Sequence, residues 1–313
     1  MSDLDATLGA LFLGVFVSTI LWGISCSQLY YYYNGYPNDR AYTKVMVLAV
    51  WASDTAHQAL VTHTLYTYLI TEYGNPTALS YITKTIVVEV LFNGITGFLV
   101  QTFFVVRVWK LSDKNNCFAA PLGLLVLAEL VFSIGYFSEA LSLSTYTELP
   151  RVRALSISMN VFAAAADVSI AGSLCFMLNR SRSEFVKSNT LINKLILFAV
   201  NTGLLTSVCA CISLITYFTL PLSFVYICFY FLMGRLYANS LLATLNARNR
   251  LRSHAATDGS LSLPDMQPSA NLARISRHGE GIAIRIETTN ESDIAQDADT
   301  SFDGASQKGT AEV

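Results

Sequence analysis

The sequence has little charge. Only 42 of its 313 residues are Asp, Glu, Lys or Arg, which is 13%, against about 25% in an average soluble domain. The shortage is uneven, because residues 247–313 hold 17 of these 42 side chains and leave 25 for the first 246 residues. A soluble protein of this length needs charged faces on nearly all of its helices. The composition therefore excludes a soluble globular enzyme and predicts an integral membrane protein with a polar tail.

Histidine and lysine are scarce in the apolar runs, where a zinc site or a retinal Schiff base would need them. Only His57 and His63 lie in apolar runs, whereas an intramembrane zinc site typically needs about three imidazoles with a carboxylate. No lysine occurs between Lys194 and Lys308, so the last apolar run has no Schiff-base lysine for retinal. Motifs such as HExxH, GxSxG and the Walker A loop are also missing where they could act. We therefore expect no metal site, no cofactor and no enzymatic activity.

Cysteine spacing and net charge exclude two further features, a disulfide framework and nucleic-acid binding. The six cysteines form no CxxC pair and predict no disulfide framework. The net charge is −2, and no basic stripe of the kind that binds nucleic acid is present. The expected environment is a lipid bilayer.

The sequence does contain seven long apolar runs. A helix needs about 20 residues to cross a hydrocarbon core of about 30 Å. The runs that are long enough are 8–32, 45–70, 85–109, 118–138, 156–178, 191–218 and 221–244. The first has Asp3 and Asp5 before it and no basic residue, so we expect an uncleaved anchor. The predicted fold is all-α: a seven-transmembrane-helix bundle over residues 1–252.

Basic residues predict how this bundle is oriented. Twelve of them fall on one side of the predicted spans: Arg40, Lys44, Arg107, Lys110, Lys114, Arg180, Arg182, Lys187, Lys194, Arg248, Arg250 and Arg252. Only Lys84, Arg151 and Arg153 fall on the other side. Because basic loops are retained in the cytoplasm, the N-terminus is predicted outside and the C-terminus in the cytoplasm. Arg235 is predicted near the inner end of the last span, with its guanidinium reaching the headgroups.

The C-terminal segment has a different composition. Residues 253–313 are rich in Ser, Thr, Asp, Ala and Gly and contain no long apolar run. Such a segment cannot bury enough apolar surface to offset the entropy lost on ordering. We expect a disordered cytoplasmic tail.

Polar side chains inside the predicted spans are the candidates for function. A charge in the hydrocarbon costs several kcal/mol, so the four acids in these spans need partners. In three of the spans, polar residues recur at i+3 or i+4 and so share one helix face. The candidates for a ligand site or proton path are Asp54, His57, Gln58, Glu89, Asn93, Gln101, Glu129, Asn160 and Asp167.

These polar stripes are compatible with several roles. The structural one is hydrogen bonding between helices. A receptor-like protein would bind a small or lipidic ligand among the second, third and fifth helices and signal to a cytoplasmic partner at the inner loops and tail. A transporter or proton-coupled channel would use the buried acids as titrating groups. A membrane scaffold would have no ligand, and its segment 239–248 could be a partner-docking helix, or a helix end whose arginines bind headgroups.

Small residues predict where helices approach closely. Gly203, Ser207 and Cys211 recur at i+4 in the sixth run, as Gly14 and Ser18 do in the first. Spacing of this kind lets two helix backbones come together.

Several residue strings resemble one known family. They are residues 23–28, Tyr30 to Tyr33 with Pro37 and Asp39, Asp54-Thr55, Gln101 with Phe103-Phe104 and Arg107, residues 167–170, residues 202–207, and residues 237–242 with 245–248. Together they resemble the fungal, mainly basidiomycete, seven-helix membrane proteins known as domain of unknown function 6534. The resemblance covers about residues 10–250 and implies a seven-helix membrane protein, without an activity, ligand or catalytic residue.

The same plan is shared by G-protein-coupled receptors, but the motifs differ. No acid precedes Arg107 at the end of the third run, and the last run has no Asn-Pro-x-x-Tyr string. The receptor-like hypothesis therefore depends on topology alone.

Overall fold

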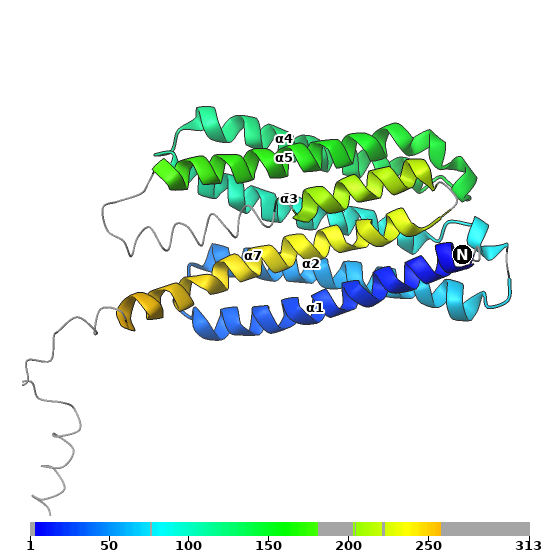
Figure 1. Ribbon diagram of the computed structural model, residues 1–313, viewed down its shortest axis with the longest axis horizontal. Helices are drawn as coiled ribbons and strands as arrows, with labels where there is room; N and C mark the ends of the chain where they lie inside the picture. The colour runs from blue at the N-terminus through cyan, green and yellow to red at the C-terminus, as the bar shows by residue number, and fades with distance from the viewer. Residues whose placement is uncertain (1–3, 76, 181–202, 204, 221–222, 258–313) are drawn as a thin grey trace, which may run out of the picture. The chain divides into compact units, whose positions relative to one another are not determined.

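The backbone is almost entirely helical (Figure 1). The computed structural model describes residues 4–75, 77–180, 203, 205–220 and 223–257. Its long helices are α1 (Ala10–Gly35), α2 (Ala41–Tyr66), α3 (Lys84–Leu111), α4 (Asn116–Ala140), α5 (Arg153–Arg180) and α7 (Val225–Thr257). A shorter apolar helix covers Leu205–Thr219. Single π-helical turns, Asp5–Gly9 and Thr67–Thr71, extend α1 and α2, and 3-10 turns cover Ala78–Ser80 and Tyr146–Val152.

Among the described residues, five helical segments are long and apolar enough to cross a membrane. They are Asp5–Gly35, Lys84–Leu111, Asn116–Ala140, Tyr146–Arg180 and Val225–Arg248. Helix α2 has the length, 26 residues, but its polar face makes it less apolar than these five. The all-α fold with apolar, membrane-length helices is thus confirmed.

Two predicted segments, the sixth span and the C-terminal tail, are described only in part. Helix α7 continues through Thr257, five residues past the predicted end of the membrane domain at 252. The first part of the predicted sixth span, and all of the tail after 257, lie outside the described residues. Disorder of the tail stays a prediction.

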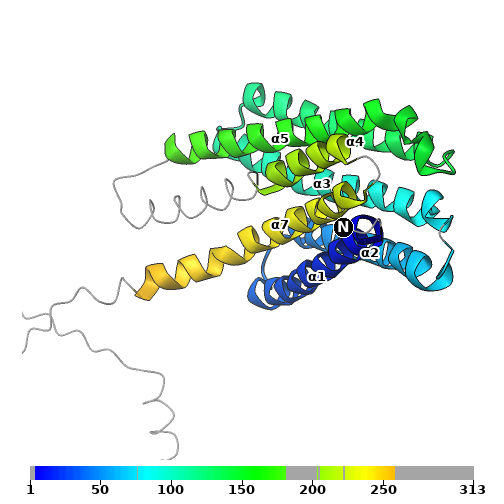
Figure 2. The ribbon, with the colours of Figure 1, turned by 45° about the vertical axis from the view of Figure 1, so that its right-hand side comes forward.

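The helices form two groups that share α3. Helix α1 packs along α7 and also contacts α2, whereas α4 packs against α5 (Figures 1 and 2). Helix α3 contacts members of both groups: α2 and α7 on one side, α4 and α5 on the other. This central position explains why α3 has the longest polar stripe, since a helix with neighbours on both sides has few positions that face lipid.

The apolar core is divided into two clusters. One includes Val50, Val100 and Leu241, toward the end of the bundle where α1 and α3 finish. The other includes Leu11 and Phe231, toward the end where these two helices begin. Most of the polar candidates lie between these clusters along their helices, so a polar layer separates two apolar ones.

Helices α1 and α7 approach each other closely. A Cβ atom added at Gly14 would lie 2.9 Å from the Cα atom of Cys228, so only glycine fits there. Further along, Asn239 donates a side-chain hydrogen bond to the carbonyl of Leu21 at 3.0 Å, and Asn246 donates one to the carbonyl of Gln28 at 2.8 Å. The second hydrogen bond lies seven residues after the first on both helices, which is about two helical turns.

Segment 239–248 of α7, a predicted candidate for partner docking, packs inside the bundle at this contact. Leu241, Leu242 and Leu245 are buried in the bundle, and the two asparagines bind α1. The arginine at the end of the string, Arg248, pairs with Asp39. The described part of this segment therefore holds α7 against α1.

The connection between α1 and α2 is tied to α7 by that ion pair. Arg248 Nη2 lies 2.6 Å from Asp39 Oδ2, and the Tyr32 hydroxyl donates to the same oxygen at 2.9 Å. Burial raises the pKa of Asp39, but the hydrogen bonds from Arg248 and Tyr32 outweigh that effect and hold the pKa below its ordinary value. The pair therefore stabilises the fold while Asp39 is ionised.

Replacing Asp39 with asparagine should destabilise the protein in a pH-dependent way. Because the pKa is lower in the folded protein than in the unfolded chain, the contribution is fully present above about pH 4 and is lost as the pH falls through the folded value. We expect Asp39→Asn to cost about 0.5–1 kcal/mol at neutral pH, since Arg248 is partly exposed. Unfolding of the purified protein, followed across pH, measures this difference.

The control is Glu148→Gln, which removes an exposed pair with Arg151 at 3.9 Å. It should change the stability little at any pH. An Asp39→Asn loss that is equal at acidic and neutral pH would contradict the assignment.

Candidate functional site

The nine polar candidates all lie inside the helix bundle, and none is more than 7% exposed. Their burial agrees with the helix faces that the spacing predicts. The structure divides them into three sets. The sets are Asp54, His57, Gln58 and Glu89 around Arg235; Gln101 and Asp167 with Tyr237; and Asn93, Glu129 and Asn160 around a small cavity.

Arg235 is the centre of the first set. Its Nη1 atom forms a buried ion pair with the carboxylate of Asp54 and donates to the Asp54 carbonyl oxygen at 2.6 Å. Its Nε atom donates to the Ser18 hydroxyl at 2.9 Å, and its Nη2 atom lies 2.5 Å from Nδ1 of His57. One side chain of α7 thereby binds both α1 and α2.

Hydrogen-bond chemistry assigns the protonation of His57. A guanidinium only donates, so Nδ1 of His57 must accept from Arg235. The ring is therefore neutral, and its proton is on Nε2. That atom lies 2.7 Å from Oε2 of Glu89 on α3. The imidazole thus connects the ion pair to α3.

Short polar side chains of α1 and α2 complete this set. Ser25 donates to Asp54 Oδ2 at 3.2 Å. Ser18 donates to Gln58 Oε1 at 3.0 Å, and Gln58 Nε2 in turn donates to the Thr19 hydroxyl at 2.8 Å. We call the set of Arg235, Asp54, His57, Glu89, Ser18, Ser25 and Gln58 the Arg235 network.

The predicted position of Arg235 is wrong. The sequence predicts its guanidinium at the headgroups, whereas the side chain is completely buried in the structure, at 0% exposure. The physical reason is that Asp54 gives the guanidinium a counter-charge inside the bundle, which removes the need to reach water. The signal was present: Arg235 is the single charged residue of the predicted last span, and a buried acid lies in α2.

Asp167 is the centre of the second set. Its carboxylate accepts hydrogen bonds from Thr206 at 2.5 Å, Tyr237 at 2.7 Å and Gln101 at 3.0 Å. These donors come from the helix 205–219, α7 and α3, while Asp167 is on α5. Four helices therefore meet at one carboxylate. Gly203 lies beside it, where an added Cβ would be 3.3 Å from the Asp167 carbonyl oxygen.

The third set surrounds a cavity of about 20 Å³. Asn93, Glu129 and Asn160 line it together with Tyr230 and Tyr237. The Glu129 Oε2 and Asn160 Oδ1 atoms are buried and accept no hydrogen bond from the described residues. The volume is enough for about one water molecule, and such a water would satisfy both atoms.

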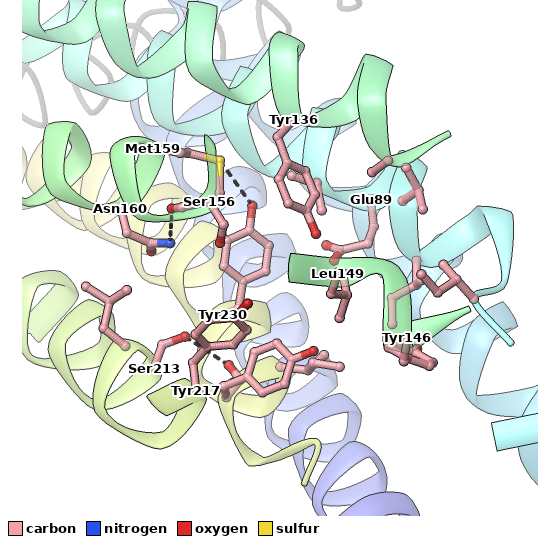
Figure 3. Close-up of a pocket in the computed structure, with 18 residues that line it drawn as sticks. Glu89, Tyr136, Tyr146, Leu149, Ser156, Met159, Asn160, Ser213, Tyr217 and Tyr230 are labelled. Atoms are coloured by element: carbon pink, nitrogen blue, oxygen red, sulfur yellow. Dashed lines mark hydrogen bonds between the residues drawn. The ribbon is translucent and has the colours of Figure 1, made fainter. Parts of the chain in front are cut away.

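A larger cavity of about 80 Å³ lies near the start of α3 and the end of α4 (Figure 3). We call it the tyrosine cavity. Its wall is formed by residues of α3, α4, α5, the helix 205–219 and α7, with the turn at Tyr146. Its aromatic members are Tyr136, Tyr146, Tyr217, Tyr226 and Tyr230. Of the nine candidates only Glu89 and Asn160 line it, and no residue of α2 does.

Sequence reasoning missed the five tyrosines of this cavity. Tyrosines near the ends of spans are typical of the membrane interface, where their rings contact headgroups. Tyr226 and Tyr230 are spaced i+4 at the start of the last helix, so they share a face. That spacing was the available signal, but it does not say whether the shared face points to lipid or to the bundle.

Hydrogen bonds fix several side chains of the cavity wall. Tyr68 donates to the carbonyl of Tyr81 at 2.8 Å, so the Tyr146 hydroxyl, 3.2 Å from the Tyr68 hydroxyl, donates to it. Ser213 donates to the carbonyl of Tyr226 at 3.1 Å. In Figure 3 the hydroxyl of Tyr136 points toward the carboxylate of Glu89.

In the described part of the chain, no three His, Cys, Asp or Glu side chains are grouped as a metal site would require. The polar sets above consist instead of acids with amide, hydroxyl and guanidinium donors. This chemistry suits hydrogen bonding, proton transfer and the binding of polar organic groups.

The comparison with protein families gives one match. Residues 163–250 match the model described as a family of unknown function (DUF6534). This confirms the resemblance to that family over a segment that includes Asp167, Arg235 and Tyr237. No curated protein matches the chain.

Removing one partner of the buried Arg235–Asp54 pair should lower the free energy of unfolding far more than removing both. We expect Arg235→Met or Asp54→Leu alone to cost about 3–5 kcal/mol, because each leaves an uncompensated buried charge. The double variant should be more stable than either single one. Denaturant unfolding of the four proteins in detergent gives the coupling energy.

The matched control is Arg151→Met, since that side chain is 76% exposed. It should change stability by less than about 0.5 kcal/mol. Additive losses in the double variant would show that the two charges do not depend on each other.

Proposed function

We propose that this protein is a seven-helix integral membrane protein that binds a small molecule in the tyrosine cavity and transmits binding across the membrane, as a receptor does. The observation that carries the proposal is the cavity itself, which combines an apolar, aromatic wall with a few polar groups. Cavities of that composition are typical of ligand sites. We propose a binding role and not a catalytic one.

The orientation in this proposal comes from the basic residues. Residues of the α2–α3 and α4–α5 connections, Ile82, Tyr146 and Leu149, line the cavity. Near that end of the bundle the basic residues of the predicted loops are only Lys84, Arg151 and Arg153. An end with so few basic residues is expected to face away from the cytoplasm. The cavity would then receive ligands from outside, with the N-terminus on the same side.

The size of the cavity favours a small ligand over a lipid. About 80 Å³ is roughly half the volume of an apolar cavity of about 150 Å³ that holds benzene. A small molecule or a head group fits this space, whereas an acyl chain is too long. The predicted site among the second, third and fifth helices is replaced in this proposal by one with no contribution from α2.

Coupling to the rest of the bundle would pass through Glu89. This residue lines the tyrosine cavity and also contacts His57, which accepts from Arg235. A ligand that changes the position or charge of Glu89 would therefore act on the pair that holds α2 and α7 together. Helix α7 passes the connection of α1 and α2, where Arg248 pairs with Asp39, and continues to Thr257. Cytoplasmic partners would detect the change at that end.

A bound molecule should co-purify with the protein. We expect native mass spectrometry of the protein, extracted into lipid nanodiscs, to show a small molecule that Ser213→Phe removes, because this substitution fills the cavity. The matched control is Ser138→Phe, at an exposed serine of α4. Equal amounts of the molecule in both variants, or none in the wild type, would contradict the proposal.

A second candidate function is proton-coupled transport. The observation that favours it is a series of polar cavities with shared walls. Asn160 and Tyr230 line both the tyrosine cavity and the cavity at Glu129, and Tyr237 lines both the latter and a third, of about 20 Å³, at Asp167. Each of the two smaller spaces is wide enough for about one water molecule, and the tyrosine cavity is larger. Protons could then move between Glu89, Glu129 and Asp167.

This candidate predicts a proton flux in proteoliposomes under a pH gradient. Asp167→Asn should reduce the flux several-fold, because it removes the titrating group while keeping the shape of the side chain. Glu139→Gln, at an exposed acid of α4, should not affect it. A flux that is unchanged by Asp167→Asn would remove transport as the function.

A further inference from the structure

We infer that the tyrosine cavity binds a small protonated amine, whose ammonium group lies against Glu89 among the tyrosine rings. The inference rests on the proposed function, because it names the ligand class of the same cavity. Three independent properties of the wall support it: its charge, its unpaired hydrogen-bonding atoms and its aromatic faces.

The charge of the wall is of one sign. Among the 18 lining residues, Glu89 is the only acid, and none is Lys, Arg or His. Behind the wall, Arg235 is already paired with Asp54 and His57 is neutral, so an ionised Glu89 would have no counter-charge of its own. The Arg235 network is thus short of one positive charge when Glu89 is ionised. A cation in the cavity would supply it, whereas an anion would be repelled.

The unpaired polar atoms of the wall are acceptors. Asn160 Oδ1 is buried and receives no hydrogen bond from the described residues, and the same holds for Glu89 Oε2 apart from its contact with His57. The amide donor of Asn160 itself is already used, because its Nδ2 donates to the carbonyl of Ser156 at 2.8 Å. A ligand rich in N–H donors would satisfy both acceptors, as an ammonium group with three donors can.

The aromatic faces suit a cation as well. Five tyrosine side chains line the cavity, and Figure 3 shows Tyr136, Tyr217 and Tyr230 placed around it. A cation over an aromatic face is attracted by the electrons of the ring, and this attraction is greatest where water is excluded. An uncharged ligand of the same shape would gain apolar contact with the rings without this attraction.

The test compares three probes that are small enough for the cavity, similar in size and different in charge: ethylammonium, ethanol and acetate. Binding is measured by saturation-transfer NMR on the full-length protein in nanodiscs, with empty nanodiscs as the blank. We expect the ammonium to bind about tenfold more tightly than the alcohol, and acetate to bind least. This comparison uses the wild type, so it does not depend on whether a variant folds.

Two variants then locate the preference. Glu89→Gln should remove most of the preference for the ammonium over the alcohol, whereas Glu139→Gln, at an exposed acid one residue before the end of α4, should retain it. Equal binding of the ammonium and the alcohol would overturn the amine inference and leave the cavity as a ligand site. Failure of all three probes to bind would overturn the inference and the proposed function together.

Discussion

A charge inside a membrane must find an opposite charge, and the rest of this structure depends on that constraint. The guanidinium of Arg235 is fully buried in α7 and pairs with Asp54 of α2. Its other donors reach Ser18 of α1 and His57 of α2, and the imidazole contacts Glu89 of α3. One buried cation thereby sets the relative positions of four helices. The close approach of α1 and α7 at Gly14 brings Ser18 within its reach.

The same constraint gives the bundle its layers and connects them to the wall of the tyrosine cavity. Apolar clusters fill both ends, and the Arg235 network lies between them. Glu89 belongs to two of these parts, because it faces His57 on one side and the tyrosine cavity on the other. In the proposed function, stability and binding therefore depend on the same residue. A ligand that contacts Glu89 acts on the interaction that positions the helices.

Helix periodicity predicts which residues are buried, but not which residues meet. The spacing of Glu89, Asn93 and Gln101 predicts one buried stripe, and all three are buried. Pairing depends on how helices from distant parts of the chain are arranged, so Arg235 was assigned to the headgroups and its pair with Asp54 was missed. The tyrosine cavity was missed for a related reason. Tyr226 and Tyr230 are equally suited to the membrane interface and to a ligand site, and only the position of the neighbouring helices decides between these.

The position of the Arg235 guanidinium in a lipid bilayer tests the central claim most directly. A density map of the protein in nanodiscs would show it. We predict density for the guanidinium joined to that of the Asp54 carboxylate and the His57 ring, in the middle of the bundle and away from the headgroups. A guanidinium that extends to the headgroup level, with Asp54 unpaired, would contradict the account.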